Sequence, residues 1–520
     1  MSTLRRLASG NLATVSAMVV NIAVQLVLLP VYLKFWDAER YGLWLVLNAA
    51  TSLLGLADQT HQDFVGFECM RQPAHDRVSR SRILSDAIPV IVIVGGIELL
   101  LLGAVLASPW ARGLVHATST TLARDFRLSL FGLMVVWSVS QNFAGTIGRV
   151  LGSVGHFATG AWWGVVVMIA TNAAPALAVS CGANFLVAAA VLGGVIVAID
   201  LLVYRHYFII MKRLGLILVR PDLRAGFARY GRSLLLSFAA ILEFMQQTGF
   251  RLVLLPLLGV VRLVQFATLR TVANVAQQGV GTLINPTAPE LMRFIAAKEG
   301  DKSAAVLVGM IYATVIFICP GLIALQLVGQ LLFTTWTLHK VPFDATAFGV
   351  LSATVMVFGL SQPSRAIVRG NNLVAAQAMV SVATAIILAL TAILATPRFG
   401  VLGAACALLL AELARSGANI AICARWMRRA GLAFPARAMA SAGLFVALTI
   451  ATILAMAAAP SLKLWLALAY APLWILMNLL FWRLIPPAAR SLIADNARGL
   501  AAKGLNLWRG DEQAGSSRGS

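Results

Sequence analysis

The sequence has few charged residues for its length. Only 12% of its 520 residues are Asp, Glu, Lys or Arg, whereas 60% are apolar. A soluble domain of this size needs about twice that charged share to cover its surface. The composition therefore excludes a soluble globular protein and predicts a chain that is surrounded mostly by lipid.

Signatures of soluble enzymes and of metal sites are also lacking. The chain contains no Gly-x4-Gly-Lys-Ser/Thr phosphate loop, no His-Glu-x-x-His zinc pair and no Gly-x-Ser-x-Gly nucleophile elbow. Its five cysteines are widely spaced, and no Cys-x-x-Cys pair is present for zinc or redox chemistry. We therefore expect no catalytic residues, no metal site and no cofactor, and we expect that the protein is not an enzyme.

Acidic residues are scarce relative to basic ones, 20 against 41, which gives a formal net charge of +21. A compact basic domain would indicate a nucleic-acid partner. Here the basic residues instead fall in short clusters between apolar stretches, mostly in the loops that would lie inside if the N-terminus is cytoplasmic. This asymmetry predicts a multi-pass protein of a bacterial inner membrane with both termini in the cytoplasm and no nucleic-acid partner.

Apolar windows of about twenty residues predict about fourteen membrane helices. They lie near residues 12–33, 41–63, 83–107, 128–150, 158–180, 184–204, 233–258, 262–284, 304–328, 342–363, 372–395, 399–423, 437–459 and 461–485. The expected fold class is therefore all-α, a polytopic integral membrane protein with two six-helix lobes and two extra C-terminal helices.

A basic cluster near the middle of the chain divides it. We expect an N-lobe at 1–204, a basic cytoplasmic linker of amphipathic, interfacial character at 205–232, a C-lobe at 233–429, helices 13 and 14 at 430–485, and a cytoplasmic tail at 486–520. Matches between the halves support this division. Leu26-Val-Leu-Leu-Pro30 recurs as Leu252-Val-Leu-Leu-Pro256, and Ser140-Gln141 recurs as Ser361-Gln362. Such repeated bundles are common among transporters.

Two stretches carry a family resemblance. Tyr41-Gly-Leu-Trp44 is followed by Leu53-Leu-Gly-Leu-Ala-Asp58 at the predicted second helix, and Pro397-Arg-Phe-Gly-Val-Leu-Gly-Ala-Ala405 opens the predicted twelfth. Both resemble motifs of the oligosaccharide flippases in the multidrug/oligosaccharidyl-lipid/polysaccharide (MOP) superfamily. The family usually has Gly where this chain has Thr60.

The resemblance implies a flippase that moves a polyprenyl-diphosphate-linked oligosaccharide, such as an O-antigen, capsule or exopolysaccharide unit, to the periplasmic leaflet by alternating access. Its expected partners are the lipid-linked oligosaccharide, membrane lipids, and a polysaccharide polymerase with other assembly proteins. Two alternatives stay open. A cation-coupled multidrug exporter of the same superfamily generally needs intramembrane acidic groups, and the first helix has none. A membrane glycosyltransferase or ligase would carry a large periplasmic loop, and the longest one here is Ser108 to Arg127.

Charged residues inside the predicted helices indicate where the cavity lies, because each costs about 2.5–3.5 kcal/mol at a helix centre. Glu243, Gln247 and Arg251 recur at spacings of four and predict a polar stripe on the seventh helix. Arg251 and Arg270 lie about eight residues before and after the following connector. They are therefore expected at one depth, where two guanidinium groups suit a diphosphate. Alternatively, Glu98 neutralises one of them as a structural pair.

Three further groups of charges lie near helix ends or share a helix. Asp58 and Asp63, near the inner end of the second helix, form either a cytoplasmic gate or an interfacial, solvated pair. Glu412 and Arg415 are three residues apart on one helix and are expected to form an ion pair. Asp200 is expected to be neutralised by the nearby Arg205.

Overall fold

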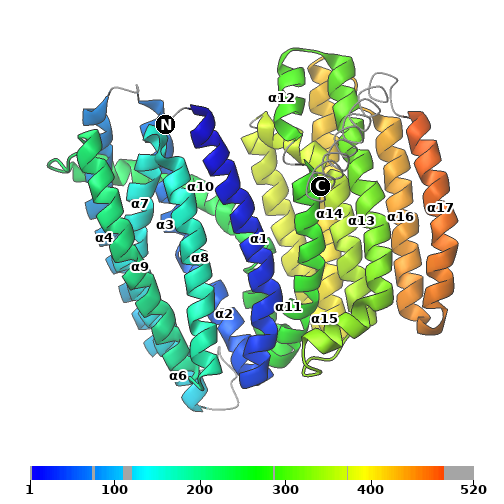
Figure 1. Cartoon of the computed structure of the whole chain (residues 1–520), viewed down its shortest axis with the longest axis horizontal. Coiled ribbons are helices and arrows are strands. Elements are labelled where there is room, and N and C mark those ends of the chain that lie inside the picture. Colours follow the sequence, from blue (N-terminus) through cyan, green and yellow to red (C-terminus); the bar gives the residue numbers. More distant parts are fainter. Residues whose placement is uncertain (1–2, 73–75, 109–119, 285–286, 372, 485–520) are drawn as a thin grey trace, which may run out of the picture. The chain divides into compact units, whose positions relative to one another are not determined.

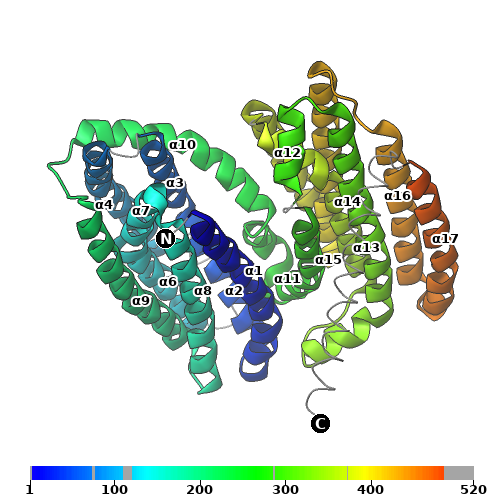
Figure 2. The same cartoon turned by 45° about the horizontal axis from the view of Figure 1, so that its top comes forward.

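The computed structural model describes residues 3–72, 76–108, 120–284, 287–371 and 373–484, and every regular element in this part is helical (Figures 1 and 2). Ten helical stretches among the described residues are long and apolar enough to cross a membrane. The predicted all-α polytopic membrane fold is confirmed. The predicted tail, 486–520, and residues 109–119 of the predicted outer loop lie outside the described residues.

Three of these stretches turn back on themselves at a glycine and supply two crossings each. The turns lie at Gly155, Gly259 and Gly400, whose positive φ values of 95°, 72° and 57° other residues rarely adopt. Residues on opposite sides of a turn meet, as the rings of Phe250 and Phe266 do at 5.7 Å. A further crossing is formed by α2 (Ala38–Leu54) with α3 (Leu56–Arg71). Ten stretches among the described residues meet the length and composition of a membrane span, and the number of about fourteen crossings stays a prediction.

The first compact unit holds residues 1–271 with 331–343 and 385–407. Besides α2 and α3, its helices are α1 (Thr3–Phe35), α4 (Arg77–Ala107), α6 (Thr120–Val136), α7 (Asn142–Leu151), α8 (Phe157–Ser180), α9 (Phe185–Leu214), α10 (Leu223–Gln246) and the first half of α11 (Phe250–Ile284). A short π-helix, η1 (Trp137–Gln141), joins α6 to α7. Helix α8 lies between α1 and α9, and α10 packs across α3 and α4 (Figure 2).

The second compact unit holds residues 272–330, 344–384 and 408–520. Its helices are the rest of α11, α12 (Ala288–Ala296), most of α13 (Gly300–Trp336), α14 (Ala345–Gly370), both ends of α15 (Val374–Arg429), α16 (Ala436–Ala458) and α17 (Lys463–Leu484). Helix α16 packs between α14 and α17. Leu464, Trp465 and Leu479 of α17 are exposed, as expected for side chains that face lipid.

Two helix boundaries differ from the prediction. The helix predicted at 41–63 is broken at Gly55, where a Cβ atom would lie only 2.7 Å from the ring of Trp137. The helix predicted to begin at 233 begins at Leu223, because the side chain of Asp222 accepts a hydrogen bond from the backbone N–H of Ala225 and caps it. An apolar window misses this amphipathic first part of α10.

Candidate functional site

Helix α3 carries an unusually polar stretch and is tied to the π-helix and α7 of the same unit. The indole Nε1 of Trp137 donates to Asp58 Oδ2 at 2.9 Å, and Gln62 Nε2 donates to Asn142 Oδ1 at 2.9 Å. Trp137 opens η1, and isolated π turns occur frequently at functional sites. Because Asp58 is only 1% exposed, it lies inside the helix packing and not in interfacial water.

The second proposed gate residue, Asp63, borders a cavity. Its Oδ1 lies 2.6 Å from Nε of Arg149 on α7, and both side chains are about half exposed, at 44% and 51%. The cavity has a volume of about 580 Å³ and lies between α3, α7, α8 and α9. Gln62 and Tyr207 also line it, together with glycines of α7 and α8 that leave room beside the backbone. The structure thus gives unit 1 a largely apolar cavity with one ion pair among the residues that line it.

Two other carboxyl groups of unit 1 have no cationic partner among the described residues. Ser140 Oγ donates to Asp200 Oδ2 at 2.6 Å, so the expected pairing of Asp200 with Arg205 is wrong. Five residues along a helix put two side chains roughly 140° apart, which explains the miss. Oε2 of Glu98 is buried without a hydrogen-bond partner in the described part of the chain, so Glu98 pairs with neither Arg251 nor Arg270 there.

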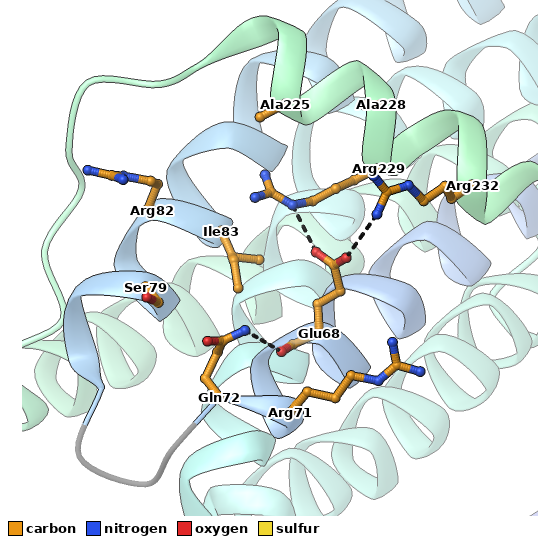
Figure 3. A pocket seen from close by; sticks show the side chains of 10 residues that line it. All are labelled: Glu68, Arg71, Gln72, Ser79, Arg82, Ile83, Ala225, Ala228, Arg229 and Arg232. Carbon is orange, nitrogen blue, oxygen red and sulfur yellow. Dashed lines mark hydrogen bonds and ion pairs between the residues drawn. The ribbon is translucent and has the colours of Figure 1, made fainter.

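A second hollow lies where α10 crosses α3 and α4 (Figure 3). We call it the arginine pocket. It has a volume of about 360 Å³ and is lined by Glu68, Arg71, Gln72, Ser79, Arg82, Ile83, Ala225, Ala228, Arg229 and Arg232. Arg229 and Arg232 converge on the carboxylate of Glu68, at 2.8 and 3.9 Å. Arg229 also donates to the buried Asp86 at 2.8 Å.

The chain reaches this pocket along a segment, 216–222, that is fixed to α4. The backbone N–H groups of Ile217, Val219 and Asp222 donate to Ser81 Oγ, Ser85 Oγ and Asp86 Oδ1 at 3.2, 2.9 and 2.7 Å. These acceptors satisfy backbone donors that have no helical partner. Residues 216–222 of the predicted basic linker are therefore held by hydrogen bonds to the N-terminal part of α4.

The same helical arrangement occurs in solved transporter structures. The lipid II flippase MurJ, in an inward closed conformation, is 12% identical and aligns over 93% of this chain and 99% of its own, with a TM-score of 0.53. An inward-facing multidrug resistance MATE family transporter of the MOP superfamily, 12% identical, aligns over 80% and 95% with a TM-score of 0.56. A MOP superfamily transporter from Pyrococcus furiosus, 11% identical, aligns over 82% and 96% with a TM-score of 0.55.

The chain shares the fold of these transporters. These neighbours are transporters and flippases and not enzymes. No family model matches the chain, and no curated protein matches it by sequence.

Within this fold, the predicted arginine pair lies on the hairpin that turns at Gly259. Arg270 is 9% exposed, and its Nη1 and Nη2 donate to the backbone carbonyls of Gln247 and Gln246 at 2.7 and 3.0 Å. These carbonyls can accept from Arg270 because the helix is interrupted there: α10 ends at Gln246 and α11 starts at Phe250. Arg270 therefore caps a helix break.

The other members of the predicted polar stripe lie around that break. Arg251 is partly buried and lies on α11, just after the break. The side chains of Glu243 and Gln247 are exposed. The break separates Glu243 from Arg251, so the spacing of four does not describe one continuous helix here.

In unit 2, Glu412 has a partner on another helix. Its Oε1 lies 3.8 Å from Nη1 of Arg365 on α14, and both side chains are nearly buried. Ser416 Oγ lies 2.9 Å from the same carboxylate oxygen. The expected salt bridge with Arg415 is not formed, because the carboxylate turns toward α14. Sequence spacing along one helix did not reveal this cross-helix contact.

Three residues in or beside the arginine pocket were not predicted as site residues from the sequence: Glu68, Asp86 and Arg229. All three lie in or beside segments predicted as basic cytoplasmic loops, where charges were counted only for topology. A usable signal was present, because Glu68 and Asp86 are acidic residues at the edges of a strongly basic region. Acidic groups in such a place indicate specific ion pairs.

Proposed function

We propose that this protein is a flippase that moves a polyprenyl-diphosphate-linked oligosaccharide from the cytoplasmic to the periplasmic leaflet of a bacterial inner membrane. The observation that carries the proposal is the extent of the structural match. The lipid II flippase aligns over 93% of this chain, whereas the MATE and Pyrococcus transporters align over 80–82%. The likeness to a flippase therefore includes parts of the chain that the other likenesses leave out.

The polar groups of unit 1 support a phosphate-bearing headgroup. In this proposal Asp63 and Arg149 form the cytoplasmic gate, since they are half exposed and join α3 to α7. Asp58 acts behind them by holding Trp137. Arg251 contacts the diphosphate, with Glu243 and Gln247 on the adjoining polar surface, while Arg270 keeps the helix break in place.

A cation-coupled exporter is the second candidate, and buried acidic groups favour it. Asp58, Glu98 and Asp200 lie among the described membrane helices without an ion pair there. A carboxylate in that setting is costly unless it takes up a proton or another cation. Such groups are the feature that an exporter of this superfamily needs.

A reconstituted transport assay separates the two candidates. Liposomes that contain the protein and a labelled short-chain polyprenyl diphosphate disaccharide should exchange the label between leaflets at least tenfold faster than empty liposomes. A membrane-impermeant bleaching reagent, which reads the outer leaflet only, measures this rate. The same liposomes loaded with a fluorescent organic cation test for export. No acceleration of the disaccharide, combined with cation efflux driven by a proton gradient, would replace the flippase with the exporter.

The orientation of the chain gives a separate prediction that uses a native thiol. Cys181 is exposed between α8 and α9, whereas Cys406 is partly exposed within the apolar helix α15 and Cys69, Cys319 and Cys423 are buried. With cytoplasmic termini, Cys181 lies on the periplasmic side. A membrane-impermeant maleimide should therefore label intact spheroplasts, and Cys181→Ser should abolish the label. In that background, Arg220→Cys should react only after permeabilisation. The opposite pattern would invert the topology.

A further inference from the structure

The side chains that line the arginine pocket are mostly basic. Four arginines and one glutamate line it, and the carboxylate of Asp86 contacts Arg229. The carboxylates of Asp76 and Asp222 accept hydrogen bonds from the backbone N–H groups of the lining residues Ser79 and Ala225. Arg71 and Arg82 are exposed and form no hydrogen bond or ion pair with another described residue. Arg232 is 68% exposed and is held only loosely by Glu68, at 3.9 Å. The pocket therefore has cationic groups available for an anion.

Two helix N-termini also border the pocket. Ser79 lies in the first turn of α4, and Ala225 and Ala228 lie in the first two turns of α10, so both helices begin at the pocket. A helix N-terminus carries partial positive charge and favours anions. The side chains of Asp76 and Asp222 already cap these two N-termini, so the guanidinium groups are the main anion-binding groups of the pocket.

Exposed apolar side chains lie next to the pocket on the same helices. Val78 on α4 and Phe227 on α10 are 69% and 42% exposed, and each is the sequence neighbour of a residue that lines the pocket, Ser79 and Ala228. In a membrane protein such side chains face lipid. A ligand here meets cationic groups and an apolar surface together, which is the environment of a lipid headgroup and not of a soluble anion.

We propose that the arginine pocket binds the phosphate groups of a membrane lipid headgroup in the cytoplasmic leaflet. Glu68 occupies the anion position in the structure described here, and the lipid phosphate takes its place on Arg232. Arg229 remains fixed by Asp86 and offers its guanidinium to the same phosphate, because arginine binds phosphate oxygens in pairs. The identification of this lipid as the polyprenyl diphosphate rests on the proposed function; phosphatidylglycerol has the same phosphate chemistry.

The test uses the purified full chain in nanodiscs of phosphatidylcholine and measures the affinity for farnesyl diphosphate. Arg82→Gln with Arg232→Gln should weaken binding about tenfold or more, since each basic group near a membrane surface contributes about a factor of five. The matched control is Arg220→Gln with Arg224→Gln, which removes the same charge from exposed positions outside the pocket. It should change the affinity less than about twofold. Equal losses in the two double variants would overturn the proposal.

A variant with the opposite effect sharpens the test. Glu68→Gln should strengthen binding several-fold, because the built-in competitor is removed while Arg229 keeps Asp86. Asp301→Asn, an exposed change of the same charge in unit 2, should leave the affinity unchanged. Weaker or unchanged binding in Glu68→Gln would contradict the exchange of glutamate for phosphate.

Competition then identifies the source of the phosphate. If phosphatidylglycerol in the nanodisc displaces farnesyl diphosphate at equal mole fraction, the site stands and its assignment to the polyprenyl carrier fails. If inorganic diphosphate displaces farnesyl diphosphate as well as a lipid does, and farnesol displaces none, the site does not recognise the lipid chain and the lipid part of the proposal fails. Binding that depends on the pocket in a protein without transport activity would refute the proposed function alone.

Discussion

Alanine in place of Asp86 should destabilise unit 1 by about 3 kcal/mol. This is the lower end of the cost of removing one partner of a buried ion pair, because Arg229 keeps Glu68 as its second partner. Asp86 is fully buried and binds two groups, Arg229 through Oδ2 and the backbone N–H of Asp222 through Oδ1. Alanine deprives both of their acceptor. Asparagine keeps an oxygen for Asp222, so its effect should be smaller.

Limited proteolysis locates this effect. Arg220 is exposed in the segment 216–222 that Asp86 helps to hold on α4. A local loss of about 3 kcal/mol raises the population of the open segment roughly a hundredfold, and the tryptic cleavage rate at Arg220 should follow it. Ser81→Ala, which removes one hydrogen bond of the same segment, is the graded control with about 1 kcal/mol. Unchanged cleavage and melting temperature in Asp86→Ala would show that other contacts hold α10.

The crossings were predictable because lipid imposes a simple rule on the chain. Each span needs about twenty apolar residues, and the connectors lie where that run is interrupted. The predicted connector between 258 and 262 contains Gly259, and the predicted connector 396–398 ends two residues before Gly400. The departures occur where the pattern is amphipathic or polar, as at the start of α10 and in α3.

The partners of the charged residues were not predictable in the same way. Arg229 meets Asp86 across 143 residues of sequence, and Glu412 meets Arg365 on another helix. Spacing along one helix gives only neighbours three or four residues away. A cross-helix ion pair depends on how two helices face each other, and a single sequence does not contain that information in local form.

The repeated serines give a more specific comparison between the halves. Ser140 donates to Asp200 in unit 1, and Ser361 lies 2.9 Å from Ser416, which in turn lies 2.9 Å from Glu412 in unit 2. Each matched serine therefore belongs to a hydrogen-bonded link to a carboxyl group on the sixth crossing of its half. This likeness in chemistry supports the proposed repeat beyond the short sequence matches.

Variants of Arg270 and Arg251 should separate a structural arginine from one that binds substrate. Arg270 bridges two adjacent carbonyls at the end of α10, where the helix dipole also favours a cation. Glutamine loses the charge and the two-pronged geometry, so Arg270→Gln should cost about 1.5–3 kcal/mol of stability. Lysine keeps the charge, and Arg270→Lys should recover part of that loss. Arg251 donates no hydrogen bond to another described residue, so Arg251→Gln should leave the melting temperature nearly unchanged.

Transport and melting temperature, measured on the same reconstituted samples, decide between the roles. For Arg270 we expect transport to fall in step with the amount of folded protein, and to recover in part with lysine. For Arg251 we expect transport to fall at least tenfold in fully folded protein, because a charge-assisted contact to the diphosphate contributes about 1.5–3 kcal/mol. A stable but inactive Arg270→Gln would make Arg270 itself a headgroup ligand. Full transport in Arg251→Gln at normal abundance would show that Arg251 does not contact the diphosphate.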